Sequence, residues 1–109
     1  MRRGEVWTIA GAGDYAGKPR PAAIVQDDRF GDIESVTVCP FTTNPMSPRL
    51  FRVSVESGEA NGLVQPSWLM ADKLMTVPKS KLGRCIARLD DATMLRLNRA
   101  ITVVLGIAG

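Results

Sequence analysis

The sequence contains no histidine, and this absence excludes more chemistry than any other feature of its composition. Histidine is the usual proton carrier at neutral pH and the commonest side-chain ligand of metal ions. The two cysteines, Cys39 and Cys85, are too few for a zinc site of their own or for a framework of disulfides, and we expect both to be small buried side chains. We therefore expect no metal and no cofactor, so that any catalysis has to use Arg, Lys, Asp, Glu, Thr or Ser.

Long apolar runs and a convincing export signal are missing as well. The basic start, Arg2 and Arg3, is followed at once by Glu5, and no typical signal sequence develops. The longest apolar stretch near the C-terminus, residues 101–108, is far shorter than the roughly 20 residues that span a bilayer. The sequence therefore predicts a cytoplasmic protein with reduced thiols and no membrane contact.

Aromatic residues are scarce, at 6% of 109 residues, and most of them are needed for packing. We expect Trp7 in the core. Trp68 stays open between a core residue and a residue that stacks on a nucleic-acid base.

What is present is typical of a single domain over residues 1–109. The hydrophobic fraction of 45% and the charged fraction of 23% fit a globular protein with one core. The net charge is only +3, but ten of the 14 basic residues are arginines. A guanidinium binds phosphate through two parallel hydrogen bonds, although an ordinary charged surface accounts for the same composition.

Short β-type runs separated by turn signals make up most of the chain. Some alternate between apolar and polar residues, as a strand with one wet face does, and others are apolar on both faces. Pro40 cannot donate to a sheet, so we expect the third strand to leave the sheet there. The expected strands cover Glu5–Ala10, Ala22–Val25, Ser35–Phe41, Phe51–Glu56, Ser67–Val77 and Gly83–Leu89.

One helical pattern follows at the C-terminal end. Asp90 or Asp91 can cap a helix over residues 92–105, and Gly106 marks its end. Leu95 and Val103 form a second apolar patch that fits either a subunit contact or additional core. The sequence predicts a mainly β fold, a small, strongly bent antiparallel sheet or partly closed barrel with this helix packed on it. The main apolar stripe of the helix is Met94, Leu97, Ile101 and Val104.

Arg20 is the clearest candidate for binding an anion. It lies between Pro19 and Pro21, which fix the backbone on either side, at the point where a glycine-rich loop enters a buried strand. A rigidly held arginine suits a phosphate group. The alternative is a simple ion pair with Asp14 or another carboxylate.

Polar residues follow the third expected strand. Thr42, Thr43 and Asn44 can donate to phosphate oxygens or to base edges, and they can equally close a turn. Asp72 is the most informative carboxylate, because an extended strand would put it on one side with Trp68 and Met70 and partly remove it from water. Burial would favour Asp72 as a proton carrier, whereas a neighbouring arginine would make it half of a structural ion pair.

The order of these segments resembles the MazF/PemK family of toxin endoribonucleases, over nearly the whole chain. The opening RGEVW, the KxRP element and the P-x-T-[TS] turn carry most of the resemblance. Residues Gly62-Leu63, Ser67, Asp72-Lys73 and Lys81-Leu82-Gly83 and the terminal helix add to it. The matching motifs are Arg3–Trp7, Gly17–Val25 and Cys39–Thr43.

The resemblance implies a small, bent, SH3-like antiparallel barrel of the CcdB/PemK type that acts as a homodimer. It further implies metal-independent cleavage of single-stranded RNA at short sequences, by attack of a 2′-hydroxyl that leaves a 2′,3′-cyclic phosphate. The implied partner is an antitoxin with an acidic tail. Arg20 and Thr42 match the catalytic arginine and threonine, and Asp72 matches an acidic position used in some members, as a candidate base. The residues expected to contact RNA are Asp14, Lys18, Thr43, Asn44, Arg49, Ser67 and Lys73.

One departure from the family pattern concerns Met70, which stands where some members have a second arginine two positions before the acid. It leaves the group that protonates the leaving oxygen unassigned, and it keeps an inactive RNA-binding homologue as one alternative. The other alternative is a non-catalytic toxin similar to CcdB, which binds DNA gyrase. Arg20 and Thr42 favour the enzyme, because a purely binding protein has no evident need for them.

Overall fold

The structure is a computed structural model that describes residues 1–10, 19–44, 51–58, 63 and 65–107. The expectations for Asp14, Lys18 and Arg49 fall outside the described residues. No helix in the described ranges has the length and apolar character needed to cross a membrane.

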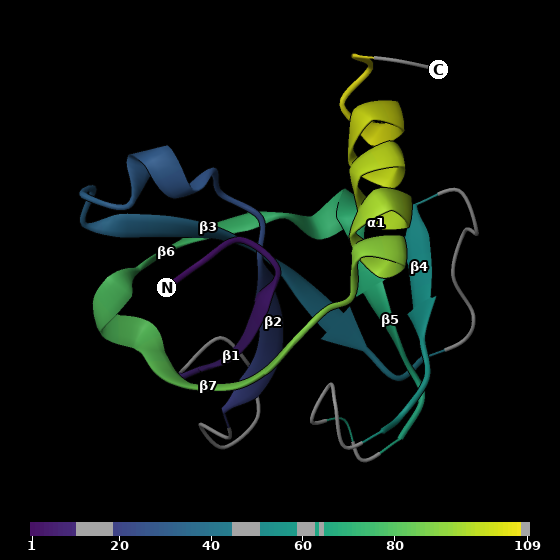
Figure 1. The fold of residues 1–109 in the computed structure, drawn as a ribbon, viewed down its shortest axis with the longest axis horizontal. Helices are drawn as coiled ribbons and strands as arrows, with labels where there is room; N and C mark the ends of the chain where they lie inside the picture. Colours follow the sequence, from purple (N-terminus) through teal and green to yellow (C-terminus); the bar gives the residue numbers. More distant parts are fainter. Residues whose placement is uncertain (11–18, 45–50, 59–62, 64, 108–109) are drawn as a thin grey trace.

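The described strands form one antiparallel sheet, in the order β4-β5-β3-β2-β1-β7, with β6 paired to β3 (Figure 1). The mainly β fold with a C-terminal helix is thus confirmed, with a bent sheet that does not close completely. Most predicted boundaries are within one or two residues of those observed. The strands are β1 (Glu5–Ile9), β2 (Arg20–Ile24), β3 (Ser35–Thr42), β4 (Arg52–Val55), β5 (Ser67–Met70), β6 (Met75–Pro78) and β7 (Leu82–Arg88), with 3-10 turns η1 (Asp28–Phe30), η3 (Ala71–Lys73) and η4 (Lys79–Lys81), and the helix is α1 (Asp91–Val104).

The strand β3 makes the bend because its two ends pair with different neighbours. On one edge, residues up to Val38 pair with β6, and from Phe41 onward the partner is β5. The prediction that the strand leaves the sheet at Pro40 is wrong, since β3 continues to Thr42. Pro40 lies where the partner changes, a place where its missing N–H costs the ladder little.

The predicted long strand over residues 67–77 is also wrong. It breaks into β5 and β6, and η3 stands between them. Asp72 therefore does not continue the alternation of β5 but lies in a tight turn. The sequence pattern missed this break because Ala71, Asp72 and Lys73 contain neither glycine nor proline.

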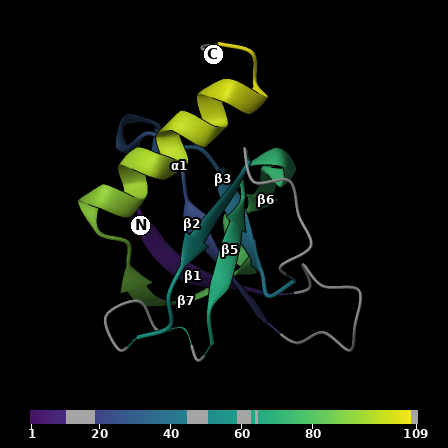
Figure 2. The same ribbon diagram turned by 90° about the vertical axis from the view of Figure 1, so that its right-hand side faces the viewer.

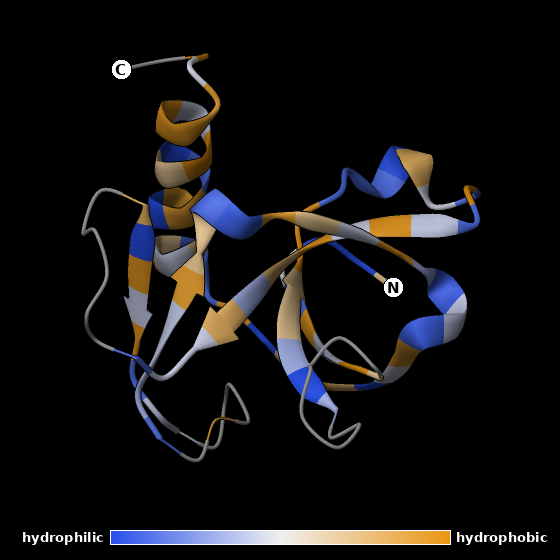
Figure 3. Ribbon diagram, turned by 180° about the vertical axis from the view of Figure 1, so that it is seen from behind, coloured by the Kyte–Doolittle hydropathy of each residue, from blue (hydrophilic) through white to orange (hydrophobic). Residues whose placement is uncertain are grey.

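Alternating residues of β3, β5 and β4 face two different environments. Phe41, Leu69 and Val53 lie opposite one another and are buried in the main core, on the side that we call the helix face. Thr42, Trp68 and Ser54, one residue away on each strand, point to the other side, the outer face. Figure 3 shows β4 and β5 in front of α1 when the molecule is seen from behind, so the helix lies on one side of them. In Figure 2 the same two strands run side by side below α1.

The helix α1 begins where the sequence predicts. Asp90 caps it by accepting a hydrogen bond of 2.7 Å from the Thr93 N–H, and hydrogen bonds from Thr93 hold the pKa of Asp90 below its usual range. Leu97 is fully buried in the main core. Leu95 and Val103 are 52% and 40% exposed, so the alternative that they form additional core is wrong for a single chain.

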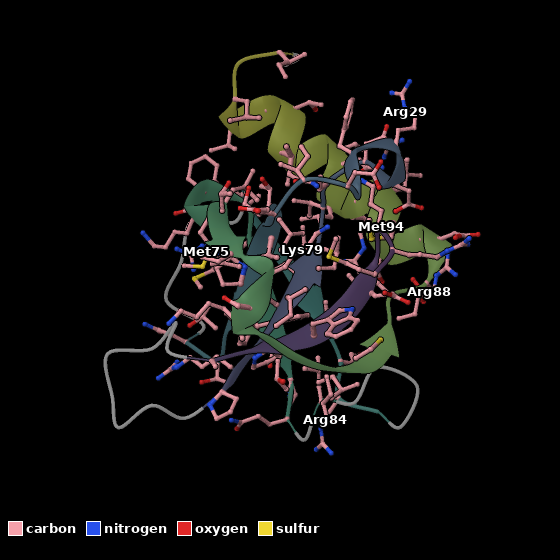
Figure 4. All side chains as sticks on the ribbon, turned by 90° about the vertical axis from the view of Figure 1, so that its left-hand side faces the viewer. Arg29, Met75, Lys79, Arg84, Arg88 and Met94 are labelled. Carbon is pink, nitrogen blue, oxygen red and sulfur yellow. The ribbon has the colours of Figure 1, made fainter. Side chains whose placement is uncertain are left out.

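The opening motif Arg3–Trp7 has a structural role in the described molecule. Arg3 donates through Nε to the carbonyl of Val25 (2.8 Å) and through Nη2 to Oδ1 of Asn98 (2.6 Å), which ties β2 to α1. Gly4 has a φ of 91°, a conformation that other residues rarely adopt, and it lies against Met94. Figure 4 shows Met94 beside this N-terminal segment.

The two cysteines differ in environment. Cys39 is buried as predicted, and burial raises the pKa of its thiol to about 12. The same prediction for Cys85 is wrong, because Cys85 is exposed. It belongs to β7, which is the edge strand of the sheet and is therefore covered from fewer sides.

Candidate active site

Arg20 and Thr42 lie on the same face of the sheet, each two residues beyond the recorded ladder of β2 with β3. The recorded pairs run from Ile24 opposite Val38 to Ala22 opposite Pro40. Alternate residues of a strand share a face, so Arg20 shares the face of Ala22 and Thr42 shares the face of Pro40. Beyond Pro40, β3 turns toward β5 and away from the start of β2 (Figure 1). The two side chains that the sequence singled out therefore share the outer face, on neighbouring strands.

Arg20 is held at its backbone and exposed at its side chain. It is the first residue of β2 and pairs with Ile9 of β1. Its guanidinium has no ion pair or hydrogen bond to any residue in the described ranges, and the alternative partner Asp14 lies outside them. A cation fixed in this way at the end of a sheet can receive an anion without first giving up a carboxylate.

Thr42 ends β3 and closes a turn with its side chain. Its Oγ1 accepts a hydrogen bond of 3.2 Å from the N–H of Asn44, so the turn-closing role considered for this segment is present. A hydroxyl has one hydrogen to donate besides the lone pairs with which it accepts. The turn therefore positions Oγ1 while leaving its O–H able to donate to a ligand on the outer face.

Thr43 and Ser67 lie on the opposite side of the sheet from Arg20 and Thr42. Both line an open pocket of about 260 Å³, together with Leu63 of the main core and Ile86, which packs against that core. Ser67 is buried, and its Oγ donates to the carbonyl of Gln65 over 3.1 Å. The structure thus separates the predicted RNA-contacting residues Thr43 and Ser67 from the Arg20–Thr42 pair. The pocket is lined by Thr8, Pro21, Thr43, Leu63, Gln65, Ser67 and Ile86.

Asp72 lies in η3, directly after β5. It forms an ion pair with Arg52, whose Nε lies 3.0 Å from Oδ1 and whose Nη2 donates to Oδ2 over 3.2 Å. Only 21% of the Asp72 side chain and 10% of the Arg52 side chain are exposed, so the predicted partial burial is confirmed. Asp72 is close enough to Cys39 to influence its thiol, and Cys39 lies three residues, about 10 Å, along β3 from Thr42.

Lys73 and Asn44 take peripheral places. The Lys73 ammonium lies 3.8 Å from Oδ2 of Asp72 and its side chain is 60% exposed. Asn44 is exposed in the turn after β3. Both remain able to meet a ligand at the rim of the outer face.

Two residues of this region were missed or left open by the sequence. Arg52 of β4 is directly opposite Met70 of β5. The neighbouring strand therefore supplies Asp72 with a guanidinium, although position 70 itself is a methionine. Trp68 is directly opposite both Thr42 and Ser54. The alternation of residues 51–56 indicated that Arg52 lies on the wet side, but only the register of β4 with β5 shows what it meets.

Comparison with known proteins gives a consistent family. The model of a family described as "PemK-like, MazF-like toxin of type II toxin-antitoxin system" matches residues 2–105. The probable endoribonuclease MazF of Mycolicibacterium smegmatis is 50% identical over 109 residues, and the match covers 100% of both chains.

Solved structures agree with this family. The Mycobacterium tuberculosis toxin MazF-mt6 is 30% identical, with a TM-score of 0.78 over 95% of this chain and 99% of that chain. An endoribonuclease in complex with its cognate antitoxin, from mycobacterial species, has the same TM-score of 0.78 at 24% identity, over 100% of this chain and 98% of that chain, and supports the fold alone. The chain belongs to the PemK-like, MazF-like toxins of type II toxin–antitoxin systems.

Proposed function

We propose that this protein is the toxin of a type II toxin–antitoxin pair, an endoribonuclease that cleaves single-stranded RNA without a metal ion. The observation that carries the proposal is the presence of Arg20 and Thr42 on the same outer face of two neighbouring strands, with the Arg20 residue exposed. The 50% identical relative named a probable endoribonuclease supports the same activity.

The proposed reaction is an attack of the RNA's own 2′-hydroxyl on the adjacent phosphorus. The O2′–P bond forms and the P–O5′ bond breaks, O2′ loses a proton and O5′ gains one, and the products are a 2′,3′-cyclic phosphate and a free 5′-hydroxyl. Arg20 binds the phosphate and stabilises the negative charge that grows on it in the transition state. The Thr42 hydroxyl donates to a non-bridging oxygen. An arginine side chain holds its proton too firmly to act as the acid or base itself.

The role of Asp72 in this proposal is structural. The sequence left two roles open for Asp72, a proton carrier or half of an ion pair. The two close contacts with Arg52 favour the ion pair. A base has to approach the proton that it removes to hydrogen-bonding distance, whereas both carboxylate oxygens of Asp72 are engaged by Arg52. The catalytic role that the resemblance implies for Asp72 stays a prediction.

The proposed partners follow from the same face. An exposed arginine that receives a phosphate also receives a carboxylate, so the acidic tail of an antitoxin can block the site by occupying it. Structures of relatives with an antitoxin, such as the MazE-MazF complex of Deinococcus radiodurans, support such a partner. A homodimer and a cytoplasmic location, where RNA substrates are found, belong to the proposal as well. The gyrase-binding alternative is not favoured, because it leaves the Arg20–Thr42 pair without a role.

The test is cleavage of a mixed single-stranded RNA pool by the purified protein in excess EDTA. We expect cleavage that continues in the chelator and products that end in a 2′,3′-cyclic phosphate, identified by mass spectrometry. The matched control is the same pool with 2′-O-methyl groups, which has no attacking hydroxyl and should stay intact. Absence of cleavage across the pool, or cleavage that returns only with added metal, would contradict the proposal.

A further inference from the structure

The two tryptophans of this chain are used differently. Trp7 is partly buried against the smaller hydrophobic cluster, around Ile9 and Val38, and its indole N–H donates to Oε1 of Glu5 over 3.1 Å. Trp68 is also half-buried, but it packs against neither hydrophobic cluster. Its indole N–H has no hydrogen-bond partner in the part of the chain that the structure describes. The prediction that Trp7 is a core residue is confirmed, whereas neither core packing nor a hydrogen bond accounts for Trp68.

The place of Trp68 connects it to the candidate active site. It stands directly opposite Thr42, whereas the next residue, Leu69, faces the main core under α1. Arg20 lies on the same face, two residues before the last recorded pair of β2 with β3. The row formed by Trp68 and Thr42 therefore presents an indole and a hydroxyl on the outer face, with the Arg20 guanidinium on the same face of the next strand.

This row has the composition of a surface for single-stranded nucleic acid. Proteins that bind single strands combine basic side chains along the backbone with aromatic rings on which bases stack. Every base has a flat face, so such stacking does not depend on a particular base. An indole beside the Thr42 hydroxyl, on the same face as the Arg20 guanidinium, matches a nucleotide, which carries an anion and an aromatic ring side by side.

We propose that Trp68 stacks on the base adjacent to the phosphate that Arg20 and Thr42 bind, and so positions the RNA for cleavage. This inference rests on the proposed function and names a residue to which the family resemblance assigned no role. Trp68 is a positioning residue, because it contacts the base and not the reacting phosphate. Its contribution is to affinity for RNA and to the alignment of the cleaved bond.

The first test uses the fact that the chain has two tryptophans. In Trp7→Phe, Trp68 is the only source of indole fluorescence, and we expect a randomised 2′-O-methyl RNA oligonucleotide, which cannot be cleaved, to quench it. The matched control is Trp68→Phe, whose remaining Trp7 should keep its emission. If Trp7→Phe does not fold, the difference between wild type and Trp68→Phe gives the same signal.

Binding of the oligonucleotide is followed separately by the anisotropy of a label on the RNA. RNA that binds while Trp68 emission stays constant would overturn the inference and leave the proposed function standing. An emission that changes with protein concentration alone, and not with RNA, would also overturn it, since a second copy of the chain would then cover the indole. Failure of the protein to bind or cut any RNA would remove both proposals together.

The second test measures cleavage. Loss of a stacking ring in Trp68→Ala should lower kcat/KM on the RNA pool by about tenfold or more, and Trp68→Phe should recover most of the loss because phenylalanine also stacks. If Trp68 had a purely structural role, Trp68→Ala would have a lower melting temperature, and Trp68→Phe would not restore kcat/KM. Equal kcat/KM values for wild type and Trp68→Ala would refute the role proposed for Trp68. Cleavage by the wild type would still support the proposed endoribonuclease function.

Discussion

Along β3, β5 and β4, successive residues alternate between the helix face and the outer face. On the helix face, Phe41, Val53 and Leu69 are at most 6% exposed and pack in the core under α1. On the outer face, Thr42, Ser54 and Trp68 remain at least partly exposed. Figure 3 shows the alternation of hydrophobic and hydrophilic residues along β4.

The difference teaches how a chain of this size combines stability with a reactive surface. Side chains of a strand alternate between the two sides of a sheet, so one side can be committed to packing while the other stays available to a ligand. If this division holds, substitutions on the helix face should change stability and leave the chemistry alone, and substitutions on the outer face should do the reverse.

The largest effect is expected for Arg20→Ala on the outer face. Removal of one group that stabilises transition-state charge lowers kcat by about a hundredfold to a thousandfold. The melting temperature should change little, because the side chain is exposed and the described residues offer it no partner. Cleavage rates on the RNA pool and thermal unfolding followed by circular dichroism measure the two quantities.

The matched control for Arg20→Ala is Arg84→Ala, which removes the same charge from β7. Figure 4 shows Arg84 pointing away from the sheet into solvent. Cleavage by Arg84→Ala should stay near the wild-type rate. Equal losses in the two variants would mean that general attraction of RNA by positive charge, and not the place of Arg20, accounts for the effect.

A somewhat smaller effect, on stability, is expected for Leu97→Ala on the helix face. Leu97 is fully buried, and truncation of such a leucine lowers the free energy of unfolding by about 2–5 kcal/mol. Well below its melting temperature the variant should keep the wild-type kcat/KM. Leu95→Ala, on the same helix but 52% exposed, is the control and should lose less than about 0.5 kcal/mol. A large loss from Leu95→Ala would instead indicate that this side of α1 is covered in solution.

The smallest effect is expected for Asp72→Asn, in the turn η3 that follows β5. Loss of the carboxylate charge from a partly buried pair should lower the free energy of unfolding by about 1–2 kcal/mol, between the values for exposed and fully buried pairs. Arg52→Gln breaks the same pair while keeping the carboxylate, so it should be destabilised by a similar amount. We expect both variants to cut RNA within about threefold of wild type. A hundredfold lower kcat in Asp72→Asn alone would restore Asp72 as the general base.

Much of the fold could be predicted from local patterns. The alternation in residues 51–56 predicted β4 with its wet side, and Asp90 with the spacing of Leu97 and Ile101 predicted α1 almost to the residue. These predictions succeeded because strand alternation and helix capping depend on neighbours in the chain. The break at η3 was missed, since the close pairing of Asp72 with Arg52 that accompanies this turn joins residues 20 positions apart.

The candidate site was predictable in its members but not in its arrangement. The resemblance pointed to Arg20, Thr42 and Asp72 together. The alternation of β2 and β3 puts the first two on one face, whereas the third forms an ion pair with Arg52. Thr43 and Ser67 fall on the opposite side of the sheet, because a one-residue step along a strand reverses the direction of its side chain.

The sequence by itself determined that imidazole chemistry is absent, that one helix follows a set of short strands, and which side chains could bind phosphate. Only the tertiary structure decided that Trp68 stands opposite Thr42, that Arg20 shares their face and that Arg52 meets Asp72. The physical reason is that strand register is set by pairing between segments distant in the chain. A shift of one residue would exchange the two faces without changing any local pattern.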